Sequence, residues 1–141
     1  LPIYSGGPGK AYLFRLYNIH LDHMGGEARR LGLELILKRA DREPAFQNIP
    51  VILAGDFNAE PDSPELAVLK SRREFTNVTE GIGVTYHGFE PEDMPERIDY
   101  IYAGAPFVCQ SVEKWEDREG NVWLSDHYPI CAVLEPGDCG E

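Results

Sequence analysis

Hydrophobic residues change their spacing twice along the first half of the chain. In residues 11–19, apolar side chains fall on both faces of an extended segment, which predicts a strand in a sheet covered on both sides. In residues 27–42 they recur at the i, i+3, i+4, i+7 spacing of an amphipathic helix. Pro50 then introduces an apolar run, residues 51–54, that stops at Gly55 as a buried central strand does. Together these segments predict a βαβ-like unit.

The second half of the chain has the composition of strands joined by turns. Ser63 followed by Pro64 is typical of a helix start and predicts a short helix over residues 64–72. The acidic, proline-containing residues 90–96 are expected to form an exposed loop. At the other end of the chain, no strand is expected upstream of Tyr12. Four β-rich segments predict strands, at residues 84–87, 98–103, 107–115 and 130–134.

Length and composition indicate one packed unit. A chain of 141 residues with 43% apolar content suits a single domain over residues 1–141. It has no apolar run of membrane-spanning length and no signal-like start, so we expect a soluble protein, cytoplasmic if its parent carries no signal peptide. The first residue is not Met, which favours a segment cut from a longer polypeptide. Three cysteines without metal-type spacing, at positions 109, 131 and 139, are expected to be reduced and non-catalytic.

The charge of the chain bears on its substrate. A formal net charge of −11 at pH 7 argues against binding of nucleic acid through many neutralised phosphates, because that affinity depends on clustered Lys and Arg. Small-molecule or lipid-like phosphate esters fit this charge better, although a bound divalent cation would offset part of it locally. Nucleic acid is therefore disfavoured and stays among the candidate substrates.

Polar residues gather where the predicted strands begin or end, which is where open α/β sheets present ligand-binding groups. Asp99 interrupts an apolar strand, so its carboxylate must be hydrogen-bonded or paired. Its partner would be an imidazole, or Arg97 in a purely structural salt bridge. The polar segments are Asn18-Ile19-His20-Leu21-Asp22-His23, Gly55-Asp56-Phe57-Asn58, Arg97-Ile98-Asp99-Tyr100 and Ser125-Asp126-His127.

Asp56 and Asn58 follow a buried strand and are two residues apart. In extended chain their side chains would project to the same side, where an acceptor and an amide can hold a water molecule. The structural alternative is an Asx turn after Gly55. His127, next to Asp126 and before the last strand, is the candidate imidazole; a lone histidine there would be structural, but its acidic neighbours favour function.

Taken together, these segments resemble the endonuclease/exonuclease/phosphatase family. Its pattern N-x-H-L-D-H, an arginine-bearing helix, G-D-F-N, R-I-D-Y and S-D-H-x-P-I occurs here in the same order, from Asn18 to Ile130. The resemblance implies an α/β (α+β) fold, the C-terminal half of a four-layered αββα sandwich with a mixed sheet and flanking helices. It also implies hydrolysis of phosphoesters by an activated water, with Mg²⁺ (or Mn²⁺) as cofactor.

The resemblance assigns roles to individual residues. Asp56 would orient or deprotonate the attacking water, and Asn58 would hold that water or the phosphate. Asp126 would help to hold the metal ion. The principal metal-binding Glu of the family comes from its first half, within a Q-E pair that this sequence lacks. The resemblance therefore covers the second half only, and we expect the isolated chain to be nearly inactive.

The two remaining roles concern the phosphate itself. Asp99 would brace His127, which would bind a phosphoryl oxygen as charge builds in the transition state, and His20 would donate a hydrogen bond to the same phosphate. These roles suit phosphoryl transfer, which needs positioning and charge neutralisation more than covalent chemistry. The segment 85–89 also looks like a stretch common in bacterial members, but no role follows for His87.

Two alternatives remain open from the sequence. Residues 20–26 look like the zinc loop of metallo-β-lactamase-like hydrolases, but Asn18 stands where the first zinc-binding histidine should be. The second alternative is a non-catalytic fragment that acts as a binding module. Half of a sandwich would expose an apolar sheet face, so the missing N-terminal half or a second copy is an expected partner.

Overall fold

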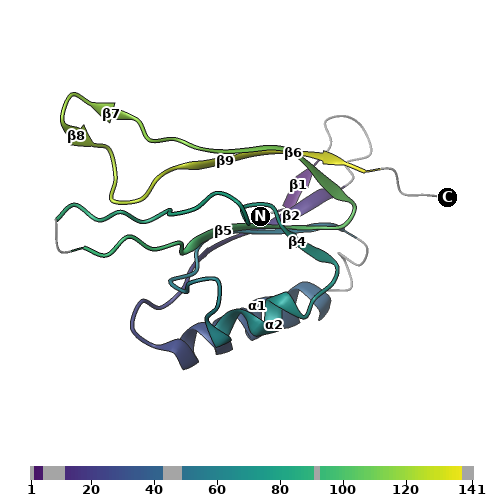
Figure 1. Ribbon diagram of the computed structural model, residues 1–141. Coiled ribbons are helices and arrows are strands. Elements are labelled where there is room, and N and C mark those ends of the chain that lie inside the picture. Colours follow the sequence, from purple (N-terminus) through teal and green to yellow (C-terminus); the bar gives the residue numbers. More distant parts are fainter. Residues whose placement is uncertain (1, 5–11, 43–48, 91–92, 138–141) are drawn as a thin grey trace.

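The computed structural model describes residues 2–4, 12–42, 49–90 and 93–137. Figure 1 shows three layers: a central sheet lies between the helices α1 (Gly26–Arg42) and α2 (Ala67–Lys70) on one side and the paired strands β6 (Phe107–Lys114) and β9 (Ile130–Pro136) on the other. This arrangement confirms the predicted α/β class with a mixed sheet and flanking helices.

The central sheet has five strands in the order β1-β2-β3-β5-β4. β2 and β3 are parallel and are connected through α1, which confirms the predicted βαβ unit, whereas the other pairs are antiparallel. The sheet consists of β1 (Pro2–Tyr4), β2 (Tyr12–His20), β3 (Val51–Asp56), β5 (Asp99–Gly104) and β4 (Phe75–Asn77).

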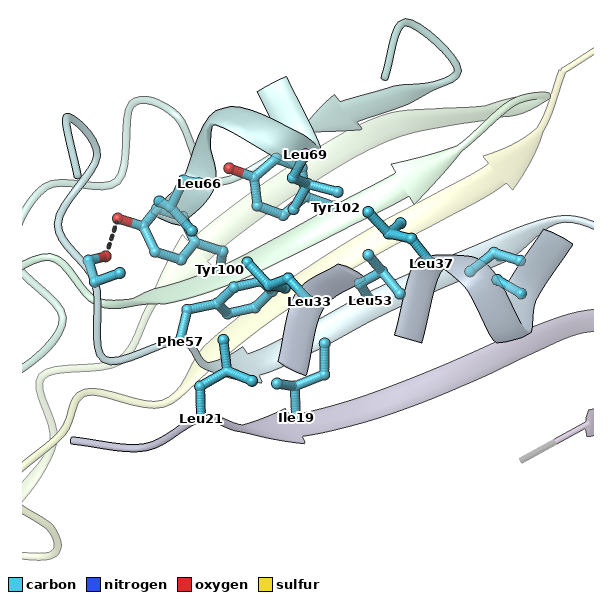
Figure 2. Close-up of a cluster of buried hydrophobic side chains, with 13 residues drawn as sticks. Ile19, Leu21, Leu33, Leu37, Leu53, Phe57, Leu66, Leu69, Tyr100 and Tyr102 are labelled. Atoms are coloured by element: carbon cyan, nitrogen blue, oxygen red, sulfur yellow. Dashed lines mark hydrogen bonds between the residues drawn. The ribbon is translucent and has the colours of Figure 1, made fainter. Parts of the chain in front are cut away.

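The main core lies between α1 and the sheet. The helix buries Leu33, Leu37 and Ala40 on one face, and this face matches the apolar spacing of the sequence. Figure 2 shows Leu33 and Leu37 of the helix within one cluster with Phe57 and Tyr100. The ring centroids of these two aromatic residues lie 5.3 Å apart in an edge-to-face arrangement.

The opposite face of the sheet is covered by the β6–β9 layer. The ring of Phe14 on β2 meets that of Phe107 on β6 edge-to-face, with centroids 5.7 Å apart. Ile19 on the same strand is buried on the helix side, so β2 is covered on both faces, as its apolar pattern predicts. Leu13 remains 49% exposed.

The predicted second helix is shorter than expected. Residues 64–66 form a 3₁₀ turn, η2 (Pro64–Leu66), and α2 ends at Lys70 rather than near residue 72. Ser63 makes no side-chain capping bond, although Pro64 does stand at the start of the turn. A 3₁₀ turn suits so short a segment, because few residues cannot support a regular α-helix.

Two strand expectations are wrong. Strand β1 lies upstream of Tyr12, where none was expected, and residues 84–87 form no strand. Gly83 and Gly88, with φ angles of +79° and +67°, bracket that segment and turn the chain away. Only Tyr86 makes isolated bridges there. The short strands β4, β7 (Arg118–Glu119) and β8 (Val122–Trp123) were not predicted.

Two further expectations concern membranes and thiols. No helix in the described ranges is both long and apolar enough to cross a membrane. Cys109 and Cys131 are free and partly buried thiols. Cys139 lies outside the described residues, as does the middle of the predicted loop at residues 91–92.

Two leucines on α1 test the importance of the helix–sheet core. Leu33 is fully buried, whereas Leu35 on the same helix is 53% exposed. We expect Leu33→Ala to lower the free energy of unfolding by about 2–5 kcal/mol, because it leaves a cavity in the core. Leu35→Ala, the matched control, should change it by no more than about 0.5 kcal/mol. Urea unfolding followed by circular dichroism measures both, and equal losses would contradict this assignment of the core.

Candidate active site

The ends of three neighbouring strands bring three polar residues into one row. Strand register pairs His20 on β2 with Asp56 on β3, and Asp56 with Asp99 on β5. Gly55 permits this close pairing: its φ is +133°, and a Cβ there would lie 2.0 Å from the carbonyl oxygen of Ile19. Residues as far as 79 positions apart in the chain thus meet where these three inner strands end or begin.

A buried aromatic ring fixes the segment that follows Asp56. Phe57 is fully buried in the core, and its backbone N–H donates to the carbonyl of Ile98 over 2.8 Å. The backbone N–H of Asn58 donates to Asp56 Oδ1 at 2.8 Å, so the Asx turn considered from the sequence is formed. The chain is therefore anchored on both sides of the Asp56 carboxylate.

Asn58 differs from the extended conformation assumed in the sequence analysis. Its φ is +48°, so Asp56 and Asn58 do not project together from a strand. The Asn58 side-chain Nδ2 donates to the carbonyl of Leu21 at 2.8 Å. Asn58 thus ties the turn after β3 to the segment after β2.

The predicted contact between Asp99 and His127 is confirmed. His127 Nδ1 lies 2.8 Å from Asp99 Oδ2, and among the described residues Asp99 forms no ion pair with Arg97. A carboxylate acceptor at Nδ1 makes that nitrogen the donor and leaves Nε2 facing away. His127 Nε2 lies 3.9 Å from Asp56 Oδ2, so the imidazole stands between the two carboxylates.

His20 approaches the same carboxylate from the other strand. Its Nε2 lies 3.6 Å from Asp56 Oδ2, and its side chain is 77% exposed. That of His127 is 27% exposed. A cavity of about 300 Å³, lined in part by Gly55, Asp99 and His127, opens beside this group. His20 is therefore open to solvent and His127 to the cavity, while the Asp56 side chain keeps 17% of its surface exposed.

Thr85 is a positioning residue that sequence reasoning did not identify. It is fully buried, and its hydroxyl accepts hydrogen bonds from the backbone N–H groups of Ile98 and Asp99, both at 3.0 Å. Its carbonyl accepts from the Tyr128 N–H at 2.7 Å. Thr85 thereby links the strand that carries Asp99 to the loop that carries His127. A small hydroxyl residue between two turn glycines was the available signal.

The surroundings of Asp56 change the pKa of its carboxyl. Burial raises the pKa of the Asp56 carboxyl, and the nearby Asp99 carboxylate raises it further. The hydrogen bond from the Asn58 N–H and the neighbouring histidines His127 and His20 act in the opposite direction, but the net change is upward. A carboxyl with a raised pKa is a better proton acceptor than an ordinary exposed aspartate.

The segment between β2 and α1 is held by a shielded ion pair. Arg29 donates through Nη2 and Nε to Glu65 Oε1 at 2.6 and 3.1 Å, and through Nη1 to the carbonyl of Asp22 at 3.0 Å. The two charged side chains are only 14% and 10% exposed. Gly26 makes room for this pair, since a Cβ there would lie 2.8 Å from Glu65 Oε1. The pair fixes the loop next to His20.

The remaining predicted residues lie apart from this group. Asp126 is partly buried, and the hydroxyl of Ser125 donates to its Oδ1 at 3.2 Å. Of the described residues, only Asp56, Asp99 and His127 form a cluster of potential metal ligands, with their ligand atoms within 4.8 Å of one another. His23 is exposed and outside that cluster, which removes the support for a zinc loop.

The chain belongs to the Endonuclease/Exonuclease/phosphatase family, which it matches over residues 2–127. The resemblance inferred from its motifs is therefore confirmed, and the metallo-β-lactamase alternative is wrong. No curated protein matches the chain.

Solved structures of similar proteins share the fold. A functionally unknown conserved protein from Enterococcus faecalis V583 is 27% identical, with a TM-score of 0.74. The match covers 86% of this chain and 50% of the Enterococcus protein. An endonuclease/exonuclease/phosphatase from Bacteroides vulgatus is 27% identical with a TM-score of 0.71, covering 84% and 48%. A mannosyl-6-phosphatase from Bacteroides thetaiotaomicron is 24% identical with a TM-score of 0.68, covering 89% and 51%. The chain thus spans about half the length of these proteins.

Because the pKa of Asp56 is raised, we expect replacement of its carboxyl by a neutral amide to stabilise the protein to a degree that depends on pH. In the folded protein Asp56 holds its proton to a higher pH than in the unfolded chain, so stability falls as pH rises through that window. Asp56→Asn has no such proton to lose. We expect its melting temperature to exceed that of the wild type at pH 7 and the difference to vanish below the ordinary pKa of aspartate.

Thermal melts between pH 3 and pH 7 measure this effect. Asp62→Asn is the control, because the Asp62 side chain is fully exposed and should give no such gain. A variant at position 56 that melts below the wild type at pH 7 would contradict the predicted direction.

The Arg29–Glu65 pair predicts a larger loss than an exposed ion pair on the same helix. Glu65→Gln leaves a shielded arginine without its counter-charge, which should lower the free energy of unfolding by about 1–3 kcal/mol. The matched control is Glu27→Gln, which removes an exposed partner of Arg30 and should leave stability unchanged. Urea unfolding compares the two, and equal effects would count against a structural role for the shielded pair.

Proposed function

We propose that this chain supplies part of the active site of a metal-dependent phosphoesterase, which hydrolyses its substrate by attack of an activated water on phosphorus. The observation that carries the proposal is the imidazole of His127, bonded to Asp99 through Nδ1 and separated by 3.9 Å from the carboxylate of Asp56 through Nε2. This arrangement places a proton acceptor and a phosphate-binding group side by side, where both can face one phosphoryl group.

Asp56 is proposed to orient the attacking water and accept its proton. Its Oδ1 is used by the Asn58 N–H, whereas its Oδ2 faces both histidines. The raised pKa of Asp56 supports this role, because a carboxylate with a higher proton affinity accepts a proton from water more readily. Asn58 is proposed to accept a hydrogen bond from the water through its side-chain oxygen, or to donate to the phosphate through the second N–H of Nδ2, the first being bonded to the Leu21 carbonyl.

His127 is proposed to donate from Nε2 to a phosphoryl oxygen as negative charge develops. Asp99 acts through it, because the bond at Nδ1 fixes the orientation of the ring and stabilises its protonated form. His20 is proposed to donate a second hydrogen bond to the same phosphate, in keeping with its exposed side chain.

A divalent cation, Mg²⁺ or Mn²⁺, is proposed to be held in part by Asp126. These ions prefer oxygen ligands and usually keep several waters beside one or two carboxylates. Asp126 offers a carboxylate next to the Ser125 hydroxyl, whereas the facing atoms of Asp99 and His127 are already bonded to each other. When bound, the cation would neutralise charge on the phosphate.

The substrate beyond its phosphate is left open by the family. Similar structures include the mannosyl-6-phosphatase and a D. rerio TDP2 complexed with single-strand DNA product, 20% identical, so the fold serves different phosphate esters. The strongly acidic charge of this chain favours small or lipid-like esters over nucleic acid. Self-association of the isolated chain, or its pairing with an N-terminal half, remains a prediction.

Hydrolysis of bis(p-nitrophenyl) phosphate tests the proposed function in the longest natural polypeptide that contains these 141 residues. We expect turnover with Mg²⁺ or Mn²⁺, its loss with EDTA and its recovery when the cation is restored. His127→Gln and Asp56→Asn should each lower kcat by roughly 10²- to 10⁴-fold, because each removes a proton-transfer or charge-stabilising group.

Glu119→Gln on the exposed strand β7 is the control and should keep wild-type turnover. Variants at positions 56 and 127 that stay within tenfold of the wild type would contradict the proposed roles. The 141-residue chain alone is expected to be nearly inactive. Turnover by that chain, lost on Asp126→Ala, would contradict this last expectation.

A further inference from the structure

A second cavity, of about 640 Å³, opens beside His127. It is lined by Trp115 and Asp117 before β7, by Trp123 of β8 and by residues from the segment 124–129 before β9. Its walls include the aromatic and aliphatic side chains Trp115, Trp123, Leu124 and Tyr128. Trp115 and Leu124 are 47% and 69% exposed, so apolar surface is open to solvent at this point. Such a concave apolar surface next to polar groups is typical of a small-molecule site.

The aromatic wall is braced by residues that do not line the cavity. The ring of His87 lies 4.5 Å from those of both Trp123 and Tyr128, measured between centroids. The guanidinium carbon of Arg118 lies 3.4 Å from the centre of the Trp123 ring, and Lys114 Nζ lies 4.6 Å from that of Tyr128. These contacts hold both rings in place, so a ligand meets a preformed surface.

The polar lining limits the class of ligand. The polar side chains that face the cavity are those of Asp117, Ser125 and His127, and no lysine or arginine is among its lining residues. A second phosphate would meet the negative charge of Asp117, and none of the described lining residues is a cation. A flat aromatic ring matches the two tryptophans and the tyrosine, because stacked or edge-on rings gain dispersion and electrostatic energy.

We propose that this cavity binds an aromatic ring carried by the phosphoester substrate, while the phosphate lies at His127. The inference rests on the proposed function and adds a substrate class to it. A phenolic ester and a nucleotide share this chemistry. They differ in reach, because a ribose separates the base of a nucleotide from its phosphate, whereas a phenolic ring is joined to it directly.

The fluorescence of the two tryptophans tests the proposal on the chain itself. Trp115 and Trp123 are the only tryptophans of the sequence, and both line the cavity. Phenyl phosphate and uridine 5′-monophosphate represent the two sources, and cyclohexyl phosphate and inorganic phosphate are the non-aromatic comparisons. We expect at least one aromatic ester to bind roughly tenfold more tightly than both comparisons, in line with the energy of ring stacking. The tighter of the two aromatic probes identifies the source.

Substitutions locate the binding. Trp123→Leu should weaken the aromatic ester roughly tenfold and leave inorganic phosphate unchanged. Val122→Ala is the matched control, since Val122 is 64% exposed, adjoins Trp123 and does not line the cavity. Leu124→Ser, at an exposed wall position, gives a second variant if circular dichroism shows that Trp123→Leu is unfolded; it should weaken the aromatic ester selectively.

Two outcomes separate this inference from the proposed function. Equal affinity for phenyl, uridine and cyclohexyl phosphates, or an aromatic affinity unaffected in a folded cavity variant, would overturn the aromatic site. p-Cresol, which has no phosphate, reports the cavity alone. Trp123-dependent binding of p-cresol together with no binding of inorganic phosphate would support the ring site and overturn only the phosphoester assignment.

Discussion

Two carboxylates, Asp56 and Asp99, lie directly opposite each other in the register of β3 and β5. Like charges in such a cross-strand pair are unfavourable, and partial burial makes them more so. His127 relieves this conflict from a different part of the chain, because its ring bonds to Asp99 at 2.8 Å and faces Asp56 at 3.9 Å. One carboxylate is thereby committed to the imidazole, while the other keeps a raised pKa. Burial, and after it the repulsion from Asp99, raises the pKa of Asp56 and so prepares it for proton transfer at a cost to stability.

The surrounding structure serves to hold this arrangement in place. Phe57 is buried immediately after Asp56, so the turn that carries the carboxylate cannot shift without opening the core. Thr85 links the strand of Asp99 to the loop of His127 through its hydroxyl and carbonyl groups. Arg29 and Glu65 fix the segment after His20. Each polar group of the site is thus supported by a contact that comes from another element.

The sequence predicted the regular parts of this fold and missed the irregular ones. The strands and helix of the βαβ unit were predicted because their apolar spacing is strong over many residues. The segment at residues 84–87 was taken for a strand from its composition, but its flanking glycines turn the chain and Thr85 uses its hydroxyl to bond β5. The helix at residues 64–72 was overextended, because a start signal does not set a length. Strand β1 has only three residues, too few for a pattern.

The candidate site shows the same division. By itself, the sequence determined which groups are available: its motifs identified His20, Asp56, Asn58, Asp99, Asp126 and His127 and the family to which the chain belongs. Only the tertiary structure decided which of them meet. It joined Asp99 to His127 rather than to Arg97, turned Asn58 out of the extended conformation and left Asp126 outside the central cluster. The aromatic cavity also came only from the fold, since residues 115–129 enclose it only when the chain turns back through β7 and β8. The chemistry of a side chain is fixed by its own residue, whereas which side chains meet depends on strand register and on packing between residues far apart in sequence.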